Sequence, residues 1–260
     1  MKHISSRDNA FFKELHKLAT SSRQRRKAGQ TLLDGAHLLR AYLDAGRKPH
    51  HLLVNAAALQ DAEVAALLQN LADVPLTQLD DGLFADLSEL KTPSGILALI
   101  ELPASAASPA QSNFCLLLED IQDPGNLGSM LRSAAAAGCD AVLLSQGCAD
   151  AWSPKVLRAG MGGHFSLFIH EAVDIPAAAA AFPGQVLAAS LSANTNLYDC
   201  DLRGALAIAV GNEGAGLSHS LLAAAGQHIT IPMPGNVESL NAAAAAAVCL
   251  FEAVRQRSNT

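Results

Sequence analysis

Asn126 and Arg132 are the chemically interesting residues of a first segment, Glu119–Arg132. An apolar, strand-like run ends where this segment begins, and Pro124-Gly125 predicts a turn after it. Asn126 can then cap a helix that carries Arg132 about one and a half turns from its start. Free N–H groups at a helix start favour an anion, and a guanidinium can grip a phosphate through two parallel hydrogen bonds. A plain capped helix with a solvated arginine explains the same residues, so this segment alone leaves both interpretations open.

A second segment, Ala209–Ser218, has three glycines between a strand-like and a helix-like run. Its spacing is G-x-x-G-x-G, which differs from the G-x-G-x-x-G of dinucleotide-binding folds. Glycine lets a ligand approach the backbone closely. Glu213 would repel a pyrophosphate, so the segment favours an adenosine-type ligand without phosphates; a flexible turn with an exposed glutamate remains the alternative.

A third segment, Ile229–Ala242, runs from a strand through two prolines into an alanine-rich helix. Ser239 is expected at the helix start, where a capping residue belongs, and Asn241 within the first turn. The helix, expected over 239–255, repeats Leu240, Ala244 and Phe251 on one face. Small residues on that face permit close packing in the core, which is the default, or against a second subunit.

These segments need strands to bring them together. Beyond residue 113 the sequence alternates nearly continuous apolar runs with helical patterns, which is typical of a parallel sheet covered on both faces. Ligands of such sheets bind at the carboxyl ends of the strands. The expected strands are 114–118, 141–144, 165–169, 186–189, 206–210 and 228–231, and the other expected helices are 127–137, 177–182 and 218–225.

The first hundred residues predict a smaller α/β domain, joined to the second through a proline-punctuated linker. We place the domains at 1–100 and 113–260, with the linker at 101–112. The expected elements of the first domain are a helix capped by Asp8 that carries Phe11 to Leu18, strands at 31–33, 51–54, 74–76 and 96–100, and helices at 36–45 and about 64–71.

The amino-acid composition limits the classes of protein to which the chain can belong. Of 260 residues, 50% are apolar and 16% are charged, which excludes wholesale disorder. No apolar run approaches the roughly 18 residues that span a bilayer, and no signal or transit peptide is recognised at the N-terminus. The five cysteines form no C-x-x-C pair and are expected to be reduced thiols of a cytoplasmic protein.

The charges are distributed unevenly along the chain. Residues 1–50 carry 11 Lys and Arg against 4 Asp and Glu, and the remaining residues carry 7 against 20. Because the first 50 residues are basic and the rest of the chain is acidic, we expect the N-terminal part to contact a polyanion, chiefly through its phosphates. The alternative is that these basic residues form a solvated helix face. The candidate residues for contact with a nucleic acid are Arg23, Arg25, Arg26 and Lys27, with Lys155 and Arg158 further along. No metal-ligand spacing is present, and His164 is expected to be structural.

At the three segments the sequence resembles the SpoU (TrmH-like) family of RNA ribose 2′-O-methyltransferases. The first motif matches Asn126, Gly128 and Arg132, the second matches Gly211, Glu213, Gly214 and Gly216, and the third matches Ile231-Pro232-Met233 and Ser239-Leu240-Asn241. The resemblance covers about residues 114–257. More loosely, the N-terminal part resembles the family's ribosomal-protein-like RNA-binding domain, at Leu32-Leu33-Asp34-Gly35 and Thr92 to Ala98.

The resemblance implies transfer of a methyl group from S-adenosylmethionine to a ribose 2′-hydroxyl of RNA. Ribosomal and transfer RNA are both compatible with it, and the additional N-terminal domain favours ribosomal RNA. The resemblance also implies a homodimer and a C-terminal trefoil knot, which no periodicity argument would propose. The displacement itself requires no metal, because no triphosphate is handled. The implied catalytic residues are Asn126, Arg132, Glu213, Ser239 and Asn241, with Arg132 reaching the partner subunit's donor. The implied cofactor-binding residues are Leu191, Gly211, Asn212, Gly214, Ile231, Met233 and Leu240.

Two other classes of function compete with this interpretation. A non-catalytic RNA-binding or assembly factor would bind RNA without methyl transfer, and the intact motif residues argue against it. A nucleotide-dependent oxidoreductase would need an early G-x-G-x-x-G with an acidic residue about 20 positions later, and the sequence has neither.

Overall fold

The computed structural model describes residues 1–88, 90, 94–103 and 112–258. They fall into two units, which we call the first unit (Met1–Ala104 with Trp152–Phe165) and the second unit (Ser105–Ala151 with Ser166–Thr260). Most of the predicted linker at 101–112, and Thr92 and Pro93 of the N-terminal resemblance, lie outside the described residues.

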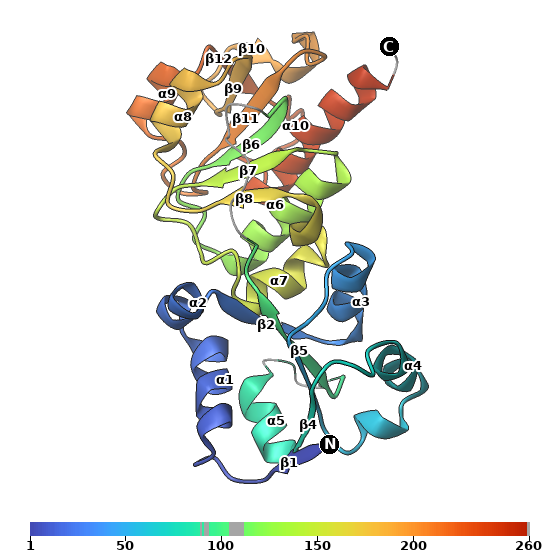
Figure 1. Cartoon of the computed structure of the whole chain (residues 1–260). Coiled ribbons are helices and arrows are strands. Elements are labelled where there is room, and N and C mark those ends of the chain that lie inside the picture. The colour runs from blue at the N-terminus through green and yellow to red at the C-terminus, as the bar shows by residue number, and fades with distance from the viewer. Residues whose placement is uncertain (89, 91–93, 104–111, 259–260) are drawn as a thin grey trace. The chain divides into compact units, whose positions relative to one another are not determined.

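The second unit contains a seven-stranded sheet in the order β10-β12-β9-β11-β6-β7-β8, and every pair of neighbouring strands is parallel (Figure 1). The predicted α/β class with a mostly parallel sheet is therefore confirmed. The strands are β6 (Phe114–Leu118), β7 (Ala141–Leu144), β8 (Phe168–His170), β9 (Gln185–Ala189), β10 (Thr195–Asn196), β11 (Leu206–Val210) and β12 (Gln227–Thr230).

Helices cover both faces of this sheet. Figure 1 shows α8 (Ile175–Ala181) and α9 (His219–Ala224) on one side, and α6 (Pro124–Ala136) and α10 (Ala242–Arg257) on the other. Alternate strand residues such as Cys115 and Leu117 pack with Ile175 and Leu221 in one buried cluster, as the two-residue period of a strand requires. Burial on both faces explains why these strands read as continuous apolar runs.

Two predicted helix starts in the second unit are wrong. Asp123, and not Asn126, caps α6 by accepting a hydrogen bond from the Asn126 backbone N–H, and Pro124 occupies the first turn, where its missing donor costs nothing. Asn241, and not Ser239, caps α10 through the N–H groups of Ala243 and Ala244.

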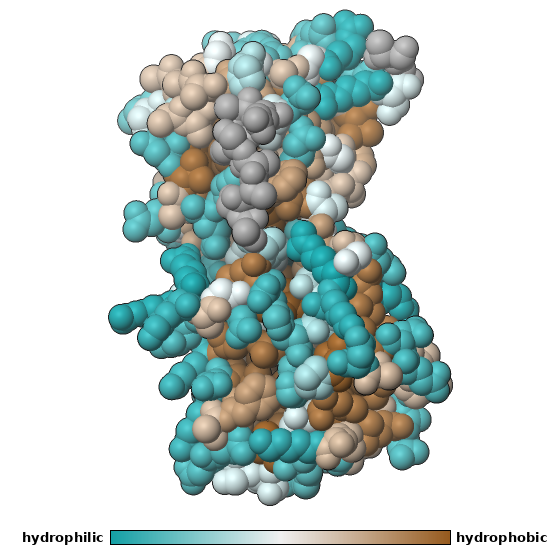
Figure 2. Space-filling model, viewed as in Figure 1, coloured by the Kyte–Doolittle hydropathy of each residue, from teal (hydrophilic) through white to brown (hydrophobic). Residues whose placement is uncertain are grey.

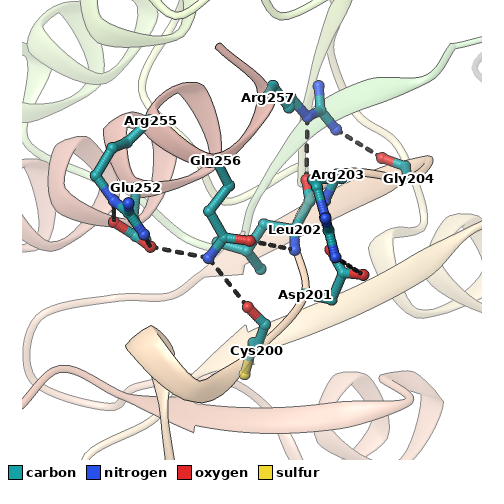
Figure 3. Close-up of polar contacts among 9 residues, drawn as sticks. All are labelled: Cys200, Asp201, Leu202, Arg203, Gly204, Glu252, Arg255, Gln256 and Arg257. Carbon is teal, nitrogen blue, oxygen red and sulfur yellow. Dashed lines mark hydrogen bonds and ion pairs between the residues drawn. The ribbon is translucent and has the colours of Figure 1, made fainter. Parts of the chain in front are cut away.

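The C-terminal end of α10 is fastened to the loop at 200–204 (Figure 3). The Gln256 amide donates to the Cys200 carbonyl and accepts from the Leu202 N–H, both at 3.0 Å. The Arg257 guanidinium donates to the carbonyls of Leu202 and Gly204. Backbone groups of this irregular loop, which have no partner within a helix or sheet, thus form hydrogen bonds with side chains of α10.

The first unit has a five-stranded sheet in the order β1-β4-β3-β5-β2, in which β5 is antiparallel to both of its neighbours. Asn9, and not Asp8, caps the first helix. The strands are β1 (Lys2–Ile4), β2 (Gln30–Asp34), β3 (His51–Val54), β4 (Leu76–Leu79) and β5 (Ile96–Glu101), and the helices are α1 (Ala10–Thr20), α2 (Ser22–Ala28), α3 (Ala36–Asp44), α4 (Ala62–Asn70), α5 (Asp81–Leu87) and α7 (Pro154–Gly160).

The segment Trp152–Phe165 packs within the first unit although it connects β7 to β8 of the second. The Thr31 hydroxyl donates to the Trp152 carbonyl at 2.8 Å, and the Phe165 ring meets the Tyr42 ring edge-on at 5.1 Å. His164 is fully buried and its ring lies 5.4 Å from that of Trp152, in agreement with the predicted structural role. This packing is why the strand expected over 165–169 begins only at Phe168, after a 3-10 turn at Gly163–Ser166.

Candidate active site

A cleft of about 340 Å³ opens at the carboxyl ends of β9, β11 and β12 in the second unit. It is lined by the segments that follow these strands and by the start of α10. All seven candidate cofactor-binding residues lie in its walls: Leu191, Gly211, Asn212, Gly214, Ile231, Met233 and Leu240. The structure therefore brings together three segments that are remote in sequence, as expected for a parallel sheet.

The second segment forms a closed loop over residues 211–217. The Asn212 side-chain oxygen accepts from the N–H groups of Gly214 and Ala215, and the Gly216 N–H donates to the Asn212 carbonyl at 2.8 Å. A Cβ on Gly211 would lie 2.3 Å from the Gly216 carbonyl oxygen, so only glycine fits there. Gly216 has a positive φ of 69°. The loop is a defined wall of the cleft rather than a flexible turn.

Three of the candidate catalytic residues form one hydrogen-bonded chain. The Asn126 amide nitrogen donates to the Glu213 carboxylate, and the Asn241 amide nitrogen donates to the Asn126 side-chain oxygen at 3.1 Å. Because Asp123 makes the helix cap, the Asn126 side chain is free to bridge α6, the closed loop and α10. The bridge places polar groups of all three motifs at one edge of the cleft.

The other two candidate catalytic residues are exposed. Ser239 lies in the cleft wall ahead of α10. Arg132 lies on α6, and it is not among the described residues that line the cleft. The structure thus joins Asn126, Glu213 and Asn241 by hydrogen bonds and places Ser239 with Glu213 in the cleft wall. Arg132 is on the same helix as Asn126 and belongs to neither set within this one chain.

The cleft lining fits S-adenosylmethionine better than a nucleotide with several phosphates. Glu213 is the only charged residue among the described residues that line it, and no lysine or arginine is there to bind a pyrophosphate. The remaining walls combine aliphatic side chains with backbone and hydroxyl groups, which is the usual lining of a small-molecule pocket. A carboxylate at the edge suits a ligand that carries a sulfonium cation.

The candidate RNA-binding residues lie in the first unit, and one of them requires correction. Arg25 is 5% exposed, and its guanidinium donates to the carbonyls of Leu18 and Ala19, so it joins α2 to α1 and cannot reach RNA in this structure. Arg23, Arg26 and Lys27 are exposed on α2, where Figure 2 shows hydrophilic side chains projecting from the surface. On α7, Lys155 is exposed and Arg158 is half-buried.

Some cleft residues were missed by sequence reasoning. Thr230, Ala242 and Ala245 line the cleft without having been singled out. Thr230 had a signal, because it is the last residue of a strand that leads into a predicted loop. The alanines had none, because a small side chain in an alanine-rich helix looks the same whether it faces a core or a ligand.

In the part of the chain that the structure describes, no group of three or more histidine, cysteine, aspartate and glutamate side chains is placed to hold a metal ion. None of the described helices combines the length and apolar character needed to cross a bilayer.

The comparisons with known proteins agree with this geometry. A family model described as the SpoU rRNA Methylase family matches residues 113–251, and one described as an MRM3-like substrate binding domain matches residues 9–98. The chain is 32% identical over 254 residues to the 23S rRNA (guanosine(2553)-2′-O)-methyltransferase RlmP of Bacillus subtilis, an alignment that covers 96% of this chain and 98% of the relative.

Solved structures give the same result. A crystal structure described as an RNA 2′-O ribose methyltransferase matches with a TM-score of 0.83 and 33% identity, over 98% of this chain and 99% of the other. The SpoU methyltransferase AviRb of Streptomyces viridochromogenes, in complex with AdoMet, matches with a TM-score of 0.83 and 27% identity, over 97% and 100% of the two chains.

The chain belongs to the SpoU rRNA Methylase family. The predictions that it is an RNA 2′-O-methyltransferase and that it uses S-adenosylmethionine are confirmed.

Proposed function

We propose that the protein transfers a methyl group from S-adenosylmethionine to a ribose 2′-hydroxyl of ribosomal RNA. The observation that carries the proposal is the Asn126–Glu213–Asn241 bridge beside a cleft lined by all seven candidate cofactor residues. Ribosomal RNA is favoured over transfer RNA because the Bacillus subtilis relative, matched over nearly its whole length, is named for 23S rRNA. That name also favours methyl transfer over a non-catalytic binding role.

Bound in the cleft, S-adenosylmethionine supplies the methyl group for an in-line displacement by the ribose 2′-oxygen. The protein must align the reacting atoms, which alone supplies several kcal/mol, and must ease proton loss from a weakly acidic hydroxyl. The closed loop at 211–217 and the aliphatic residues Leu191, Ile231 and Leu240 hold the nucleoside. The bridged Asn126 and Asn241, with Ser239, orient the ribose, and Glu213 shapes the edge of the site.

Arg132 acts by charge and not as a base. A guanidinium stays protonated in proteins and has no acceptor for a proton. Arg132 therefore holds the phosphate beside the target ribose and stabilises the developing alkoxide. Since Arg132 is exposed and lies outside the cleft wall, it serves the cleft of a second copy of the chain in a homodimer.

The remaining parts of the proposal concern the organisation of the protein. Residues 1–100 bind RNA through the exposed basic residues of α2, with Lys155 and Arg158 as further phosphate contacts, and residues 113–260 carry out methyl transfer. The C-terminal segment forms a trefoil knot, a proposal supported by the strand order, in which β12 lies between β9 and β10 and leads to α10 beside α6. The protein works in the cytoplasm, a location supported by its similarity to a bacterial 23S rRNA methyltransferase.

The role of Arg132 is tested with Arg132→Ala and Arg132→Lys. We expect both variants to bind S-adenosylmethionine like wild type and to lose single-turnover methyl transfer, with partial activity in the lysine variant because it keeps the charge but not the bidentate geometry. Normal single-turnover rates in Arg132→Ala would refute the role. Mapping 2′-O-methylation in total RNA from cells with and without the protein would identify the nucleotide.

A further inference from the structure

Glu119 is a buried carboxylate to which the mechanism above assigns no role. It directly follows β6, its backbone N–H donates to the Val210 carbonyl at 3.1 Å, and the residue is 8% exposed. Its two carboxylate oxygens accept from one residue: the Ser218 N–H donates to Oε2 and the Ser218 hydroxyl donates to Oε1, both at 2.7 Å. Among the described residues, no lysine or arginine forms an ion pair with Glu119, so Ser218 is the partner that the structure provides.

Ser218 stands where the closed loop of the cleft ends. The loop at 211–217 begins at the end of β11, and its first turn is tied back by the Asn212 amide, which donates to the Asp120 carbonyl at 3.0 Å. Its last residue, Leu217, precedes Ser218. Residues 119 and 120 therefore hold both ends of a loop whose seven residues all line the cleft.

We propose that Glu119 is a positioning residue for S-adenosylmethionine, acting through Ser218 on the loop at 211–217. The inference rests on the proposed function of this cleft. A charged acceptor that satisfies two donors makes stronger hydrogen bonds than a neutral one, and the side chain is fixed because it is buried. The closed loop has internal hydrogen bonds that preserve its shape, but its place relative to β9 and β12 is set by attachments to the rest of the unit. Residues 119 and 120 hold its two ends, and Asn126 holds Glu213 in its middle.

A purely structural role must be separated from this one, because Ser218 also caps α9 by accepting from the Leu221 N–H at 3.2 Å. Loss of Glu119 therefore lowers stability in either case. The distinguishing readout is affinity for the cofactor, together with the split between KM and kcat.

The test uses Glu119→Gln in the full-length protein. Glutamine has the same shape, but its amide nitrogen cannot accept, so one of the two Ser218 donors loses its partner. We expect the Kd for S-adenosylmethionine, measured by calorimetry, to rise about 10-fold, as the loss of a hydrogen bond to a charged group implies. The KM for S-adenosylmethionine rises in parallel, while kcat at saturating cofactor stays within about twofold of wild type.

Ser218→Ala provides a milder second variant, since it keeps the backbone N–H. We expect a smaller rise in Kd, and no further rise when it is combined with Glu119→Gln, because the two residues act through one contact. Asp174→Ala is the matched control. Asp174 caps α8 in the same unit by accepting from the Ala177 N–H at 3.0 Å, and it does not line the cleft. Loss of this cap lowers the Tm and leaves the Kd unchanged.

A wild-type Kd in folded Glu119→Gln, or in folded Ser218→Ala if the first variant does not fold, overturns the inference. So does an equal rise in Kd in Asp174→Ala. Failure of the wild-type protein to bind S-adenosylmethionine would instead overturn the proposed function itself, and the two failures are therefore distinguishable.

Discussion

A single amide, that of Asn126, joins three parts of the chain that are far apart in sequence. Its nitrogen donates to Glu213 and its oxygen accepts from Asn241, so both ends of the side chain are used. Replacing the side chain removes both hydrogen bonds and so separates the three parts, although water can reach the exposed groups that are left.

Asn126→Asp is expected to be more damaging than Asn126→Ala, because the new carboxylate would face the carboxylate of Glu213. We expect the single-turnover rate of methyl transfer to fall about 10-fold in the alanine variant, which loses a hydrogen bond to a charged group. We expect it to fall about 100-fold in the aspartate variant, which loses that bond and adds repulsion between two carboxylates. Rapid-quench measurements check this. Asn70→Asp, an identical change at an exposed position in the first unit, is the control. Equal rates in both Asn126 variants would mean that the Glu213 contact has no catalytic effect.

The cysteine side chains provide a second prediction at this scale. Burial raises the pKa of Cys115 to about 11 and that of Cys249 to about 12, because the thiolate would be desolvated. Only the thiolate reacts readily, so both should resist iodoacetamide at pH 8 in the folded protein and react after unfolding. Peptide mass spectrometry follows each site. Rapid labelling of Cys115 in the native protein would contradict its burial.

At the level of single residues, the sequence predicted which side chains form the site better than it predicted their local roles. The motif residues of the closed loop and of the start of α10 were assigned through the resemblance to the SpoU family, and most of them line one cleft. The caps were misassigned because Asp123 and Asn126 are both good capping residues, as are Ser239 and Asn241, and tertiary contacts decide which position begins the helix. Arg25 was misjudged because a basic cluster does not show which of its members faces inward.

At the level of elements, the central strands of the second unit's sheet were predicted well, whereas the shortest edge strands were missed and β4 was expected too early in the chain, at 74–76. The central strands β6, β7, β9 and β11 lie close to their predicted ranges, since burial on both faces leaves a continuous apolar run. The two-residue β10 and the three-residue β1 were not identified, because short strands at a sheet edge carry too few apolar residues to show a period.

The C-terminal turn of α10 shows how one element is secured by its own charged residues. Arg255 donates twice to the Glu252 carboxylate at 2.8 Å, and the Gln256 amide donates to the same carboxylate while also binding the Cys200 carbonyl (Figure 3). Glu252 thereby orients the amide that fixes the loop at 200–204.

This arrangement predicts a dependence of stability on pH. Hydrogen bonds, first from Arg255 and then from Gln256, lower the pKa of Glu252. A lowered folded-state pKa means that the contribution is complete above the ordinary glutamate pKa of about 4.3 and is lost as the pH falls through the lower value. Glu252→Gln should therefore reduce the Tm by about 2–4 °C at pH 7 and by less near pH 3.5. Thermal unfolding across this range tests it, and a constant difference would contradict it.

At the level of the whole molecule, the uneven distribution of charge predicts how RNA binding responds to salt. Changing Arg23, Arg26 and Lys27 together to glutamine should weaken binding at low salt and reduce the slope of log K against log salt by about 2, since each phosphate contact contributes about 0.7 for single strands. Filter binding with ribosomal RNA fragments measures the slope. Lys13→Gln is the control, because the Lys13 ammonium is paired with Asp8 at 2.8 Å. An unchanged slope in the triple variant would exclude α2 from the interface.

The packing of Trp152–Phe165 against β2 and α3 has a consequence for how the protein is made. Chains generally begin to fold from the N-terminus during their synthesis. The buried Thr31 hydroxyl, however, finds its acceptor only at Trp152, and the Tyr42 ring finds its neighbour only at Phe165. The earliest part of the polypeptide must therefore wait, incomplete, while more than fifty further residues leave the ribosome. Packing of the first unit is therefore completed late in synthesis, although its strands and most of its helices come early in the sequence.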